Sequence, residues 1–271
     1  MRRFRPSCYS VGGTTLDAYN ANRCDARTGE WVRYRVQSSR RTGDSRVITC
    51  EIPDGRSLGA CVIAGLKIRA LGMDKSYSPI SHPELRGRFD LLVKPYSRGL
   101  GAHLCSLDVG DCVECKLKPA RDPLIARNRF SHVGMVANGT GVAPFVNVLA
   151  ALLDDSFDHT RLSLVVTHSS EDRGLLVDDL EELAARHERF NLTTIYTESM
   201  PRIDAALLRS TMPPPVDHNL VLVCGTDAFV AAVAGPITRV RDDDGRKRKL
   251  QGPTLGFLGS LGYEPRHVFK L

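Results

Sequence analysis

Residues 136–144, Val-Ala-Asn-Gly-Thr-Gly-Val-Ala-Pro, are the stretch that most strongly indicates the fold. An apolar strand runs into a glycine turn, and a helix is expected to open near Pro144. In that geometry the backbone N–H groups and the positive end of the helix dipole face an anion such as a pyrophosphate. Glycines have no Cβ, so a ligand can approach the backbone closely. The stretch predicts a nucleotide-binding turn, although a glycine turn that serves only packing is the alternative.

Around this turn, strands and helices alternate from about residue 130 to the end of the chain. Such alternation predicts a parallel sheet with both faces covered. Ligands of these sheets bind at the carboxyl ends of the strands. The expected strands are 132–137, 161–167, 191–196 and 220–224, and the expected helices are 144–153, 175–187, 205–211 and 228–233.

The first half of the chain is different, because short β-branched runs are separated by turn signals such as Thr42-Gly43-Asp44. This spacing predicts a small antiparallel barrel or sandwich with one helix at about 101–107. The expected strands are 31–37, 46–52, 60–68, 89–93 and 111–117. With a boundary at 118–130, the 271 residues divide into a β domain at 31–121 and an α/β domain at 130–271.

Composition is that of an ordinary soluble globular protein, with 42% hydrophobic and 25% charged residues. No apolar run approaches the roughly 18 residues of a membrane span, so no transmembrane segment is expected. The net charge is +6, but the basic run 246–249 follows Asp242, Asp243 and Asp244 after a single glycine. Opposed blocks of this kind predict a solvated loop and argue against a nucleic-acid partner.

The first 30 residues are expected to be an extension of the β domain. They contain Arg2, Arg3 and Arg5, and no acid precedes Asp17. This composition suits a mitochondrial targeting segment. The alternative is a basic tail without a function, with the protein in the cytoplasm.

Eight cysteines are scattered along the chain, and Cys112 and Cys115 form a single CxxC. In the strand expected there, residues three apart point to opposite faces. A second CxxC or a nearby His pair that would complete a metal site is missing from the sequence. We therefore expect a reduced, structural pair and no metal.

Two further segments carry chemistry-bearing residues in strand-and-turn settings. Residues 220–225, Leu-Val-Leu-Val-Cys-Gly, place Cys224 at the carboxyl edge of the predicted sheet, although a buried and inert cysteine is the common case. In the β domain, Lys75-Ser76-Tyr77-Ser78-Pro79 precedes Leu92-Val93-Lys94-Pro95-Tyr96. A tyrosine beside a hydroxyl residue and a proline offers a flat face to a ring, or is simply a core tyrosine at a turn.

Taken in order, these elements resemble the ferredoxin reductase-like flavoproteins and, within them, the NADH–cytochrome b5 reductases. The resemblance covers roughly residues 31–271 and implies an antiparallel β-barrel flavin domain followed by a Rossmann-like nicotinamide nucleotide domain with a parallel sheet. The segments that match the family's motifs are Lys75–Pro79, Val93–Tyr96, Gly99–Gly101, Asn138–Pro144 and Cys224–Asp227.

The resemblance also implies roles for individual residues. Tyr77 would stack near the flavin ring, and Ser78 would hydrogen-bond around its N5. Thr140 would approach the flavin from the second domain, and Cys224 would lie near the nicotinamide. Ser78 and Cys224 are the expected catalytic residues. The expected cofactor-binding residues are Lys75, Tyr77, Ser78, Pro79, Val93, Tyr96, Leu100, Gly101, Ala102, Gly139, Thr140, Gly141, Pro144, Cys224, Gly225 and Thr226.

Several positions depart from the family's motifs. Lys75 stands where the family has an Arg that pairs with the flavin pyrophosphate, and lysine lacks the bidentate fork. Gly101 replaces the Ser of the phosphate segment and leaves only backbone donors. Asn138 replaces a Gly, and Thr226 and Asp227 replace prolines. An acid at Asp227 would weaken the binding of an anionic dinucleotide if it faces the cleft.

The function that the resemblance implies is an FAD-dependent oxidoreductase that takes hydride from NADH and passes electrons to a haem protein of the cytochrome b5 or cytochrome c type. Glu171 and Glu198 at strand ends would favour NADH over NADPH. The tail, Ala234–Pro236, Gln251–Pro253 and Val268–Leu271, also resembles mitochondrial flavoproteins that assist haem attachment to cytochrome c. Two rival interpretations are a degenerate, non-catalytic flavin-fold scaffold and an NADPH-dependent reductase of a small molecule.

Overall fold

The computed structural model describes residues 29–58, 62–63, 65–82, 85–118, 124–241 and 247–271. Two compact units are present. The first holds the described residues up to 127 together with 143–158 and 172–179, and the second holds 128–142, 159–171 and 180–271. Each unit is made of separate segments of the chain, so the domain limits 31–121 and 130–271 stay a prediction. The targeting segment stays one too, because residues 1–28 lie outside the described residues.

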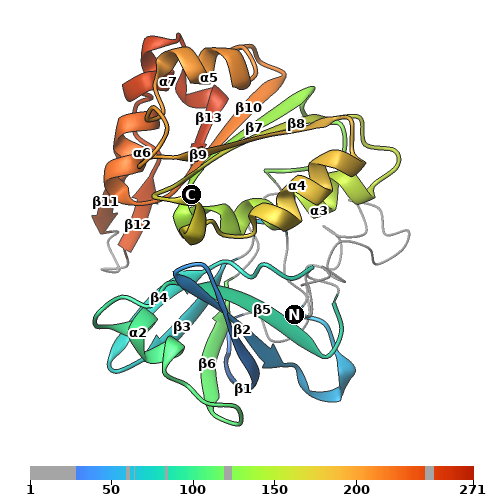
Figure 1. Cartoon of the computed structure of the whole chain (residues 1–271), viewed down its shortest axis with the longest axis vertical. Coiled ribbons are helices and arrows are strands. Elements are labelled where there is room, and N and C mark those ends of the chain that lie inside the picture. Colours follow the sequence, from blue (N-terminus) through green and yellow to red (C-terminus); the bar gives the residue numbers. More distant parts are fainter. Residues whose placement is uncertain (1–28, 59–61, 64, 83–84, 119–123, 242–246) are drawn as a thin grey trace. The chain divides into compact units, whose positions relative to one another are not determined.

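The first unit is built on a six-stranded antiparallel sheet with the order β4-β3-β6-β1-β2-β5 (Figure 1). β1 serves two partners, since Trp31–Arg35 pair with β6 and Val36–Thr42 pair with β2 across an irregularity. An isolated bridge between Pro79 and Leu91 links the end of β4 to β5, the two outer strands. The strands are β1 (Trp31–Thr42), β2 (Ser45–Glu51), β3 (Leu66–Ala70), β4 (Met73–Tyr77), β5 (Arg88–Val93) and β6 (Cys112–Leu117).

Side chains of these strands form one hydrophobic core. Ile48, Ile68 and Leu91 are fully buried, and the rings of Tyr34 and Phe89 meet edge to face at 5.1 Å between centroids. The helix α2 (Leu100–Cys105) contributes Leu100 and Leu104 to the same cluster. Burial of these side chains fixes α2 against the sheet, and with it the turn that precedes α2.

The second unit is built on a parallel sheet with the order β13-β10-β7-β8-β9. The inner strands β7, β8 and β10 are buried almost without interruption, as expected for strands covered on both faces, whereas in the edge strand β9 only Phe190 and Ile195 are buried. Side chains of α5, α6 and α7 pack with those of β7, β8, β9, β10 and β13 in one cluster. The strands are β7 (His132–Asn138), β8 (Arg161–His168), β9 (Phe190–Tyr196), β10 (Asn219–Cys224) and β13 (Val268–Lys270).

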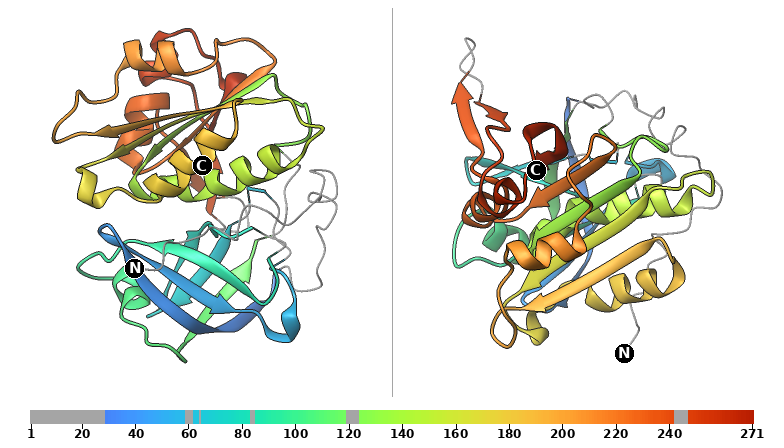
Figure 2. Two further views of the ribbon diagram at one scale, coloured as in Figure 1. Left: turned by 45° about the vertical axis from the view of Figure 1, so that its right-hand side comes forward. Right: turned by 90° about the horizontal axis from the view of Figure 1, so that it is seen from above.

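The helices are α3 (Ala143–Asp154), α4 (Val177–Arg186), α5 (Ala205–Thr211), α6 (Asp227–Ala234) and α7 (Gly256–Ser260), and the short 3₁₀ turns are η1 (Pro53–Gly55), η2 (Gly139–Val142), η3 (Glu171–Arg173) and η4 (Pro265–His267). A separate two-stranded ribbon, β11 (Thr238–Arg241) and β12 (Lys247–Leu250), stands out from the helices of its unit (Figure 2). We call it the β11–β12 hairpin.

The predicted fold class is confirmed: an antiparallel β unit and a parallel α/β unit share the chain. Two local predictions are wrong. The strand expected at 60–68 begins only at Leu66, because Val62 and Ile63 form a turn. The basic run expected as a loop contains β12, which pairs with β11 from Lys247 to Leu250. Lys270 donates to the carbonyls of Pro236 and Pro253, and these bonds hold the two ends of the hairpin together.

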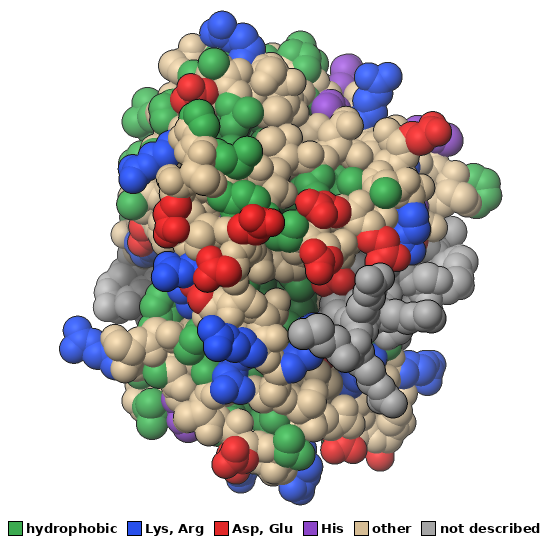
Figure 3. Space-filling view, in the orientation of Figure 1, with side chains coloured by type: hydrophobic (Ala, Val, Ile, Leu, Met, Phe, Trp, Pro, Cys, Tyr) green, Lys and Arg blue, Asp and Glu red, His purple; other side chains and the backbone are tan. Residues whose placement is uncertain are grey.

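The CxxC behaves as the strand period predicts. Cys112 is exposed and Cys115 is buried, and both are free thiols. Among the described residues, no group of His, Cys, Asp and Glu could hold a metal ion. Within the same part of the chain, no helix is long and apolar enough to cross a membrane. Side chains of both signs of charge are mixed on the face shown in Figure 3.

Candidate cofactor sites

The Lys75–Pro79 segment ends β4 and continues beyond it. β4 pairs with β3, so that Tyr77 lies opposite Leu66 and Lys75 opposite Ile68. Lys75 is exposed, whereas Tyr77 is half-buried against the core of the first unit. Burial raises the pKa of Tyr77 to about 12, and the neighbouring Cys105 and Tyr96 add to the shift. The phenol is therefore a neutral hydroxyl that can donate a hydrogen bond.

The segment that follows Tyr77 is held by hydrogen bonds at Pro79 and Ile80. Ile80 donates its backbone N–H to the carbonyl of Asp90 at 2.9 Å, and the Asp90 carboxylate accepts from the Thr49 hydroxyl at 2.7 Å. The Pro79 carbonyl accepts a hydrogen bond at 3.1 Å from Nδ2 of the buried Asn147 on α3, which groups with the first unit. Sequence reasoning missed Asn147, since an amide inside an apolar helix carries no signal of its own.

The segment from Lys94 to Ala102 connects β5 to α2. Val93 is buried in the core, and Tyr96 is 56% exposed. A Cβ added to Gly101 would lie 2.7 Å from the Lys94 carbonyl oxygen, so the backbone itself occupies the space of a side chain. This contact explains why a glycine stands where the family has a serine, because the first turn of α2 packs directly against the backbone at the end of β5.

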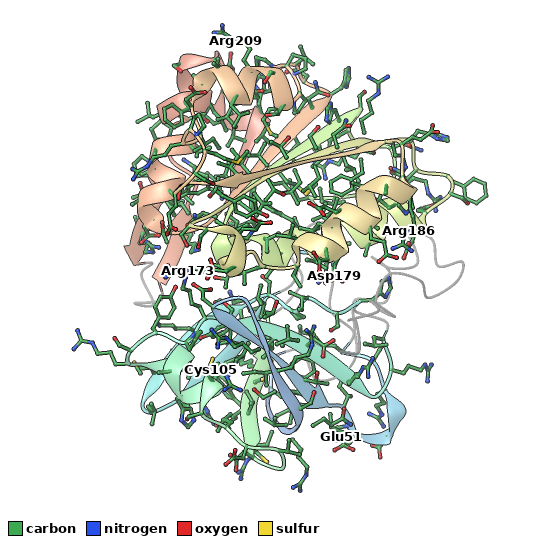
Figure 4. The ribbon with its side chains drawn as sticks, in the orientation of Figure 1. Glu51, Cys105, Arg173, Asp179, Arg186 and Arg209 are labelled. Atoms are coloured by element: carbon green, nitrogen blue, oxygen red, sulfur yellow. The ribbon has the colours of Figure 1, made fainter. Side chains whose placement is uncertain are left out.

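A cavity of about 480 Å³ lies beside this segment. The Lys94 ammonium contacts the Asp44 carboxylate at 2.6 Å. Although burial opposes it, this hydrogen bond and the charge of Lys94 hold the pKa of Asp44 below its usual value. Figure 4 labels Cys105, whose thiol lies 3.7 Å from the Val93 carbonyl. The cavity is lined by Arg41, Asp44, Ser45, Arg46, Pro95, Tyr96, Ala102, Cys105 and Ser106.

The cavity and its surroundings fit part of an FAD molecule. Arg41 and Arg46 supply positive charge for a pyrophosphate, and Tyr77 and Tyr96 supply ring faces nearby. Sequence reasoning predicted Tyr96 and Ala102 but missed Arg41, Asp44 and Arg46. Their turn was visible in the sequence, but pairing of β2 with β5, which sets Arg46 opposite Val93, places it beside the segment that leads into α2, and that pairing is not a local property.

The 136–144 turn has the predicted form of strand, turn and helix. Asn138 ends β7 and donates from Nδ2 to the Thr167 hydroxyl at the end of β8, at 2.9 Å. The departure from glycine at this position therefore ties two strand ends together. Gly139 has a φ of +52°, a conformation that glycine adopts without strain, and the space beside it is open. α3 begins at Ala143, one residue before Pro144.

Gly141 lies against the second turn of the same unit. A Cβ on Gly141 would be 2.5 Å from the Cys224 carbonyl oxygen and 2.9 Å from the Gly225 Cα. One on Gly225 would be 3.1 Å from the Asn138 Cβ. The two turns after β7 and β10 are thus packed backbone to backbone at the carboxyl edge of the sheet. This close approach, together with the open space at Gly139, fits a dinucleotide laid across the turns.

Cys224 is half-buried at this edge, and burial raises the pKa of its thiol to about 11. The thiol is therefore neutral near pH 7 and does not act there as a base or an anionic nucleophile. Thr226 caps α6, since its hydroxyl accepts from the Phe229 backbone N–H at 3.3 Å. Asp227 is the first residue of α6 and pairs with Arg239 at 2.8 Å.

Glu171 and Glu198 follow β8 and β9 at the same edge, and both are exposed. The Glu198 N–H donates to the Ser169 carbonyl at 2.9 Å, which joins the two strand-end loops. The predicted residues between Lys75 and Ala102 lie in the first unit, and those of the turns after β7 and β10 lie in the second, except that Pro144 on α3 groups with the first unit. The approach of Thr140 to the flavin involves both units and stays a prediction.

Comparisons with known proteins agree with the two groups. The model of the oxidoreductase FAD-binding domain matches residues 44–118, and that of the oxidoreductase NAD-binding domain matches residues 135–235. These matches define a chain with one FAD-binding and one NAD-binding domain. An NADH-cytochrome b5 reductase-like protein of Arabidopsis thaliana is 31% identical in an alignment 262 residues long that covers 89% of this chain and 76% of the relative.

An NADH-cytochrome b5 reductase 2 of Aspergillus fumigatus is 28% identical over 97% of this chain and 85% of the relative. The chain belongs to the NADH–cytochrome b5 reductase family of oxidoreductases. Solved structures share its fold. The cytochrome b5 reductase domain of Ulva prolifera nitrate reductase has a TM-score of 0.67 at 22% identity, over 74% of this chain and 89% of that one. Phthalate dioxygenase reductase has a TM-score of 0.58 at 17% identity, over 92% and 83%.

Proposed function

We propose that this protein takes hydride from NADH onto bound FAD and passes electrons to a haem protein of the cytochrome b5 type. The observation that carries the proposal is the presence, in one chain, of a charged cavity in an FAD-binding match and a pair of packed turns in an NAD-binding match. Names of the relatives support the donor and the acceptor. FAD supplies the chemistry, because it accepts an electron pair and releases electrons singly.

The residues of the chain bind and orient the reactants. In this proposal Tyr77 and Ser78 present neutral hydroxyls to the flavin ring, and Arg41 with Arg46 places positive charge near its phosphates. The turns at Gly139–Gly141 and Cys224–Thr226 hold the dinucleotide through their backbone. Glu171 and Glu198 support the preference for NADH, since a 2′-phosphate would be repelled by two carboxylates.

The tail that resembles cytochrome c-directed flavoproteins has a structural explanation in this chain. The buried Lys270 ammonium donates to the carbonyls of Pro253, Pro236 and Ala234 at 3.0, 3.2 and 3.5 Å. Gln251 exchanges two hydrogen bonds with the Lys270 backbone. These bonds hold the tail segments together within the chain. The tail therefore has a structural role of its own, and its sequence does not by itself favour cytochrome c as the electron acceptor.

The test is an anaerobic titration of the FAD-loaded protein with NADH, followed by visible absorption, with NADPH as the matched control. We expect NADH to bleach the oxidised flavin, and a subsequent addition of oxidised cytochrome b5 to restore the flavin spectrum. A flavin that stays oxidised with both nucleotides contradicts the proposal. Failure to bind FAD in stoichiometric amount would instead favour the non-catalytic scaffold.

A further inference from the structure

Asp227 is an acid at the edge where an anionic dinucleotide is proposed to bind. It is the residue directly after the Cys224–Thr226 turn, and its side chain is 74% exposed. A carboxylate in this place repels a pyrophosphate unless nearby cations compensate it.

Two cations of the β11–β12 hairpin supply this compensation. The Arg239 guanidinium contacts the Asp227 carboxylate at 2.8 Å, and Lys249 is the direct cross-strand partner of Arg239. Residues directly opposite in an antiparallel pair project from the same face. The hydrogen bond from Arg239 and, more weakly, the charge of Lys249 hold the pKa of Asp227 below its usual value. The charge of Lys249 also lowers the pKa of the Cys224 thiol and so opposes the larger, raising effect of burial. One positive charge is left in excess beside the turn.

The hairpin is an addition to the part of the chain that the family model describes. The NAD-binding match ends at residue 235, and both Arg239 and Lys249 lie beyond it. The base of the hairpin is held by Lys270, which donates to the carbonyls of Pro236 just before β11 and Pro253 just after β12. The two cations thus come from a ribbon with fixed ends, not from a free loop.

We propose that Arg239 and Lys249 determine the affinity for the nicotinamide dinucleotide, by neutralising Asp227 and leaving net positive charge beside the Cys224 turn. The inference rests on the proposed function, because it assigns two further residues to the same dinucleotide site. It requires that removing a positive charge weakens the binding of the dinucleotide and that removing the negative charge strengthens it. A structural role of the cluster would instead make every substitution harmful.

The test uses FAD-loaded protein with Lys249→Gln, Arg239→Gln and Asp227→Asn, measured by KM for NADH and by the Kd of NAD⁺ in a binding titration. At low ionic strength we expect the first two to raise both constants about threefold and Asp227→Asn to lower them by a similar factor. The value of kcat should move less than twofold. In 0.5 M salt, about a 4 Å screening length, the differences should largely vanish.

Arg266→Gln is the matched control. Arg266 forms a similar exposed ion pair with Asp217 at 2.8 Å, but Asp217 precedes β10, at the opposite edge of the sheet from Cys224. We expect no change in either constant. Equal effects of Arg266→Gln and Arg239→Gln, or a rise with Asp227→Asn, would overturn the inference. A wild-type flavin that NADH does not reduce, while NAD⁺ binding follows the predicted signs, would overturn the proposed function alone.

Discussion

The two candidate cofactor sites of this protein are formed by different kinds of contact. In the first unit, the cavity is bordered by charged side chains, with the Lys94–Asp44 pair at 2.6 Å and two arginines on its wall. In the second unit, two turns meet through backbone atoms, with Gly141 against the carbonyl of Cys224. A site made of charges should respond to a change of charge, and a site made of backbone contacts should respond to a change of volume.

The largest effect is expected from Gly141→Ala. Its Cβ would lie 2.5 Å from a carbonyl oxygen that cannot rotate away, so the two turns must separate. We expect a loss of about 1–3 kcal/mol in the free energy of unfolding and a KM for NADH raised at least tenfold, measured by thermal unfolding and steady-state kinetics.

Gly139→Ala is the control for this prediction, because the space beside Gly139 is open and only its φ of +52° opposes a side chain. The expected cost is about 1 kcal/mol of unfolding free energy. If the two alanines lower stability and NADH affinity equally, the backbone contact between the turns does not matter and the comparison between the units fails.

A smaller effect is expected from Lys94→Gln in the first unit. The substitution leaves the Asp44 carboxylate without its partner beside the cavity, so we expect FAD to bind about fivefold more weakly, in a fluorescence titration. Lys67→Gln breaks a similar 2.6 Å pair with Asp74 between β3 and β4 and serves as the control. Equal FAD affinities for the two variants would show that charge at the cavity is unimportant.

The smallest effect concerns thiol reactivity. Cys112 is exposed, whereas the half-buried Cys224 has its pKa raised to about 11 and carries little thiolate at pH 8. Iodoacetamide at pH 8 should therefore modify Cys112 first and Cys224 slowly, with the rate at Cys224 rising as the pH approaches 11. Peptide mapping by mass spectrometry measures both. Equally rapid labelling of Cys224 at pH 8 would place it in an open and electropositive environment.

Much of the fold followed from local patterns. The alternation of strands and helices after residue 130 predicted the parallel sheet, and α5 was predicted at its observed limits, Ala205–Thr211. Buried runs such as 220–223 carry this signal because a strand covered on both faces is apolar throughout. The prediction was wrong for the basic run at 246–249. Charge patterning describes a segment alone, whereas pairing with β11 and the bonds of Lys270 make part of that run a strand.

The sequence by itself determined that antiparallel strands precede alternating strands and helices, and it determined the positions of the turns and the residue types in them. These are local properties, since glycines, strand periods and motif spacing act within a few residues. Tertiary structure alone decided that Gly141 touches the Cys224 backbone and that Asp44 meets Lys94. It also decided that Asp227 is compensated from a hairpin beyond it in the chain. Each of these contacts joins residues far apart in sequence, and only strand pairing and the packing of helices on the sheet bring them within bonding distance.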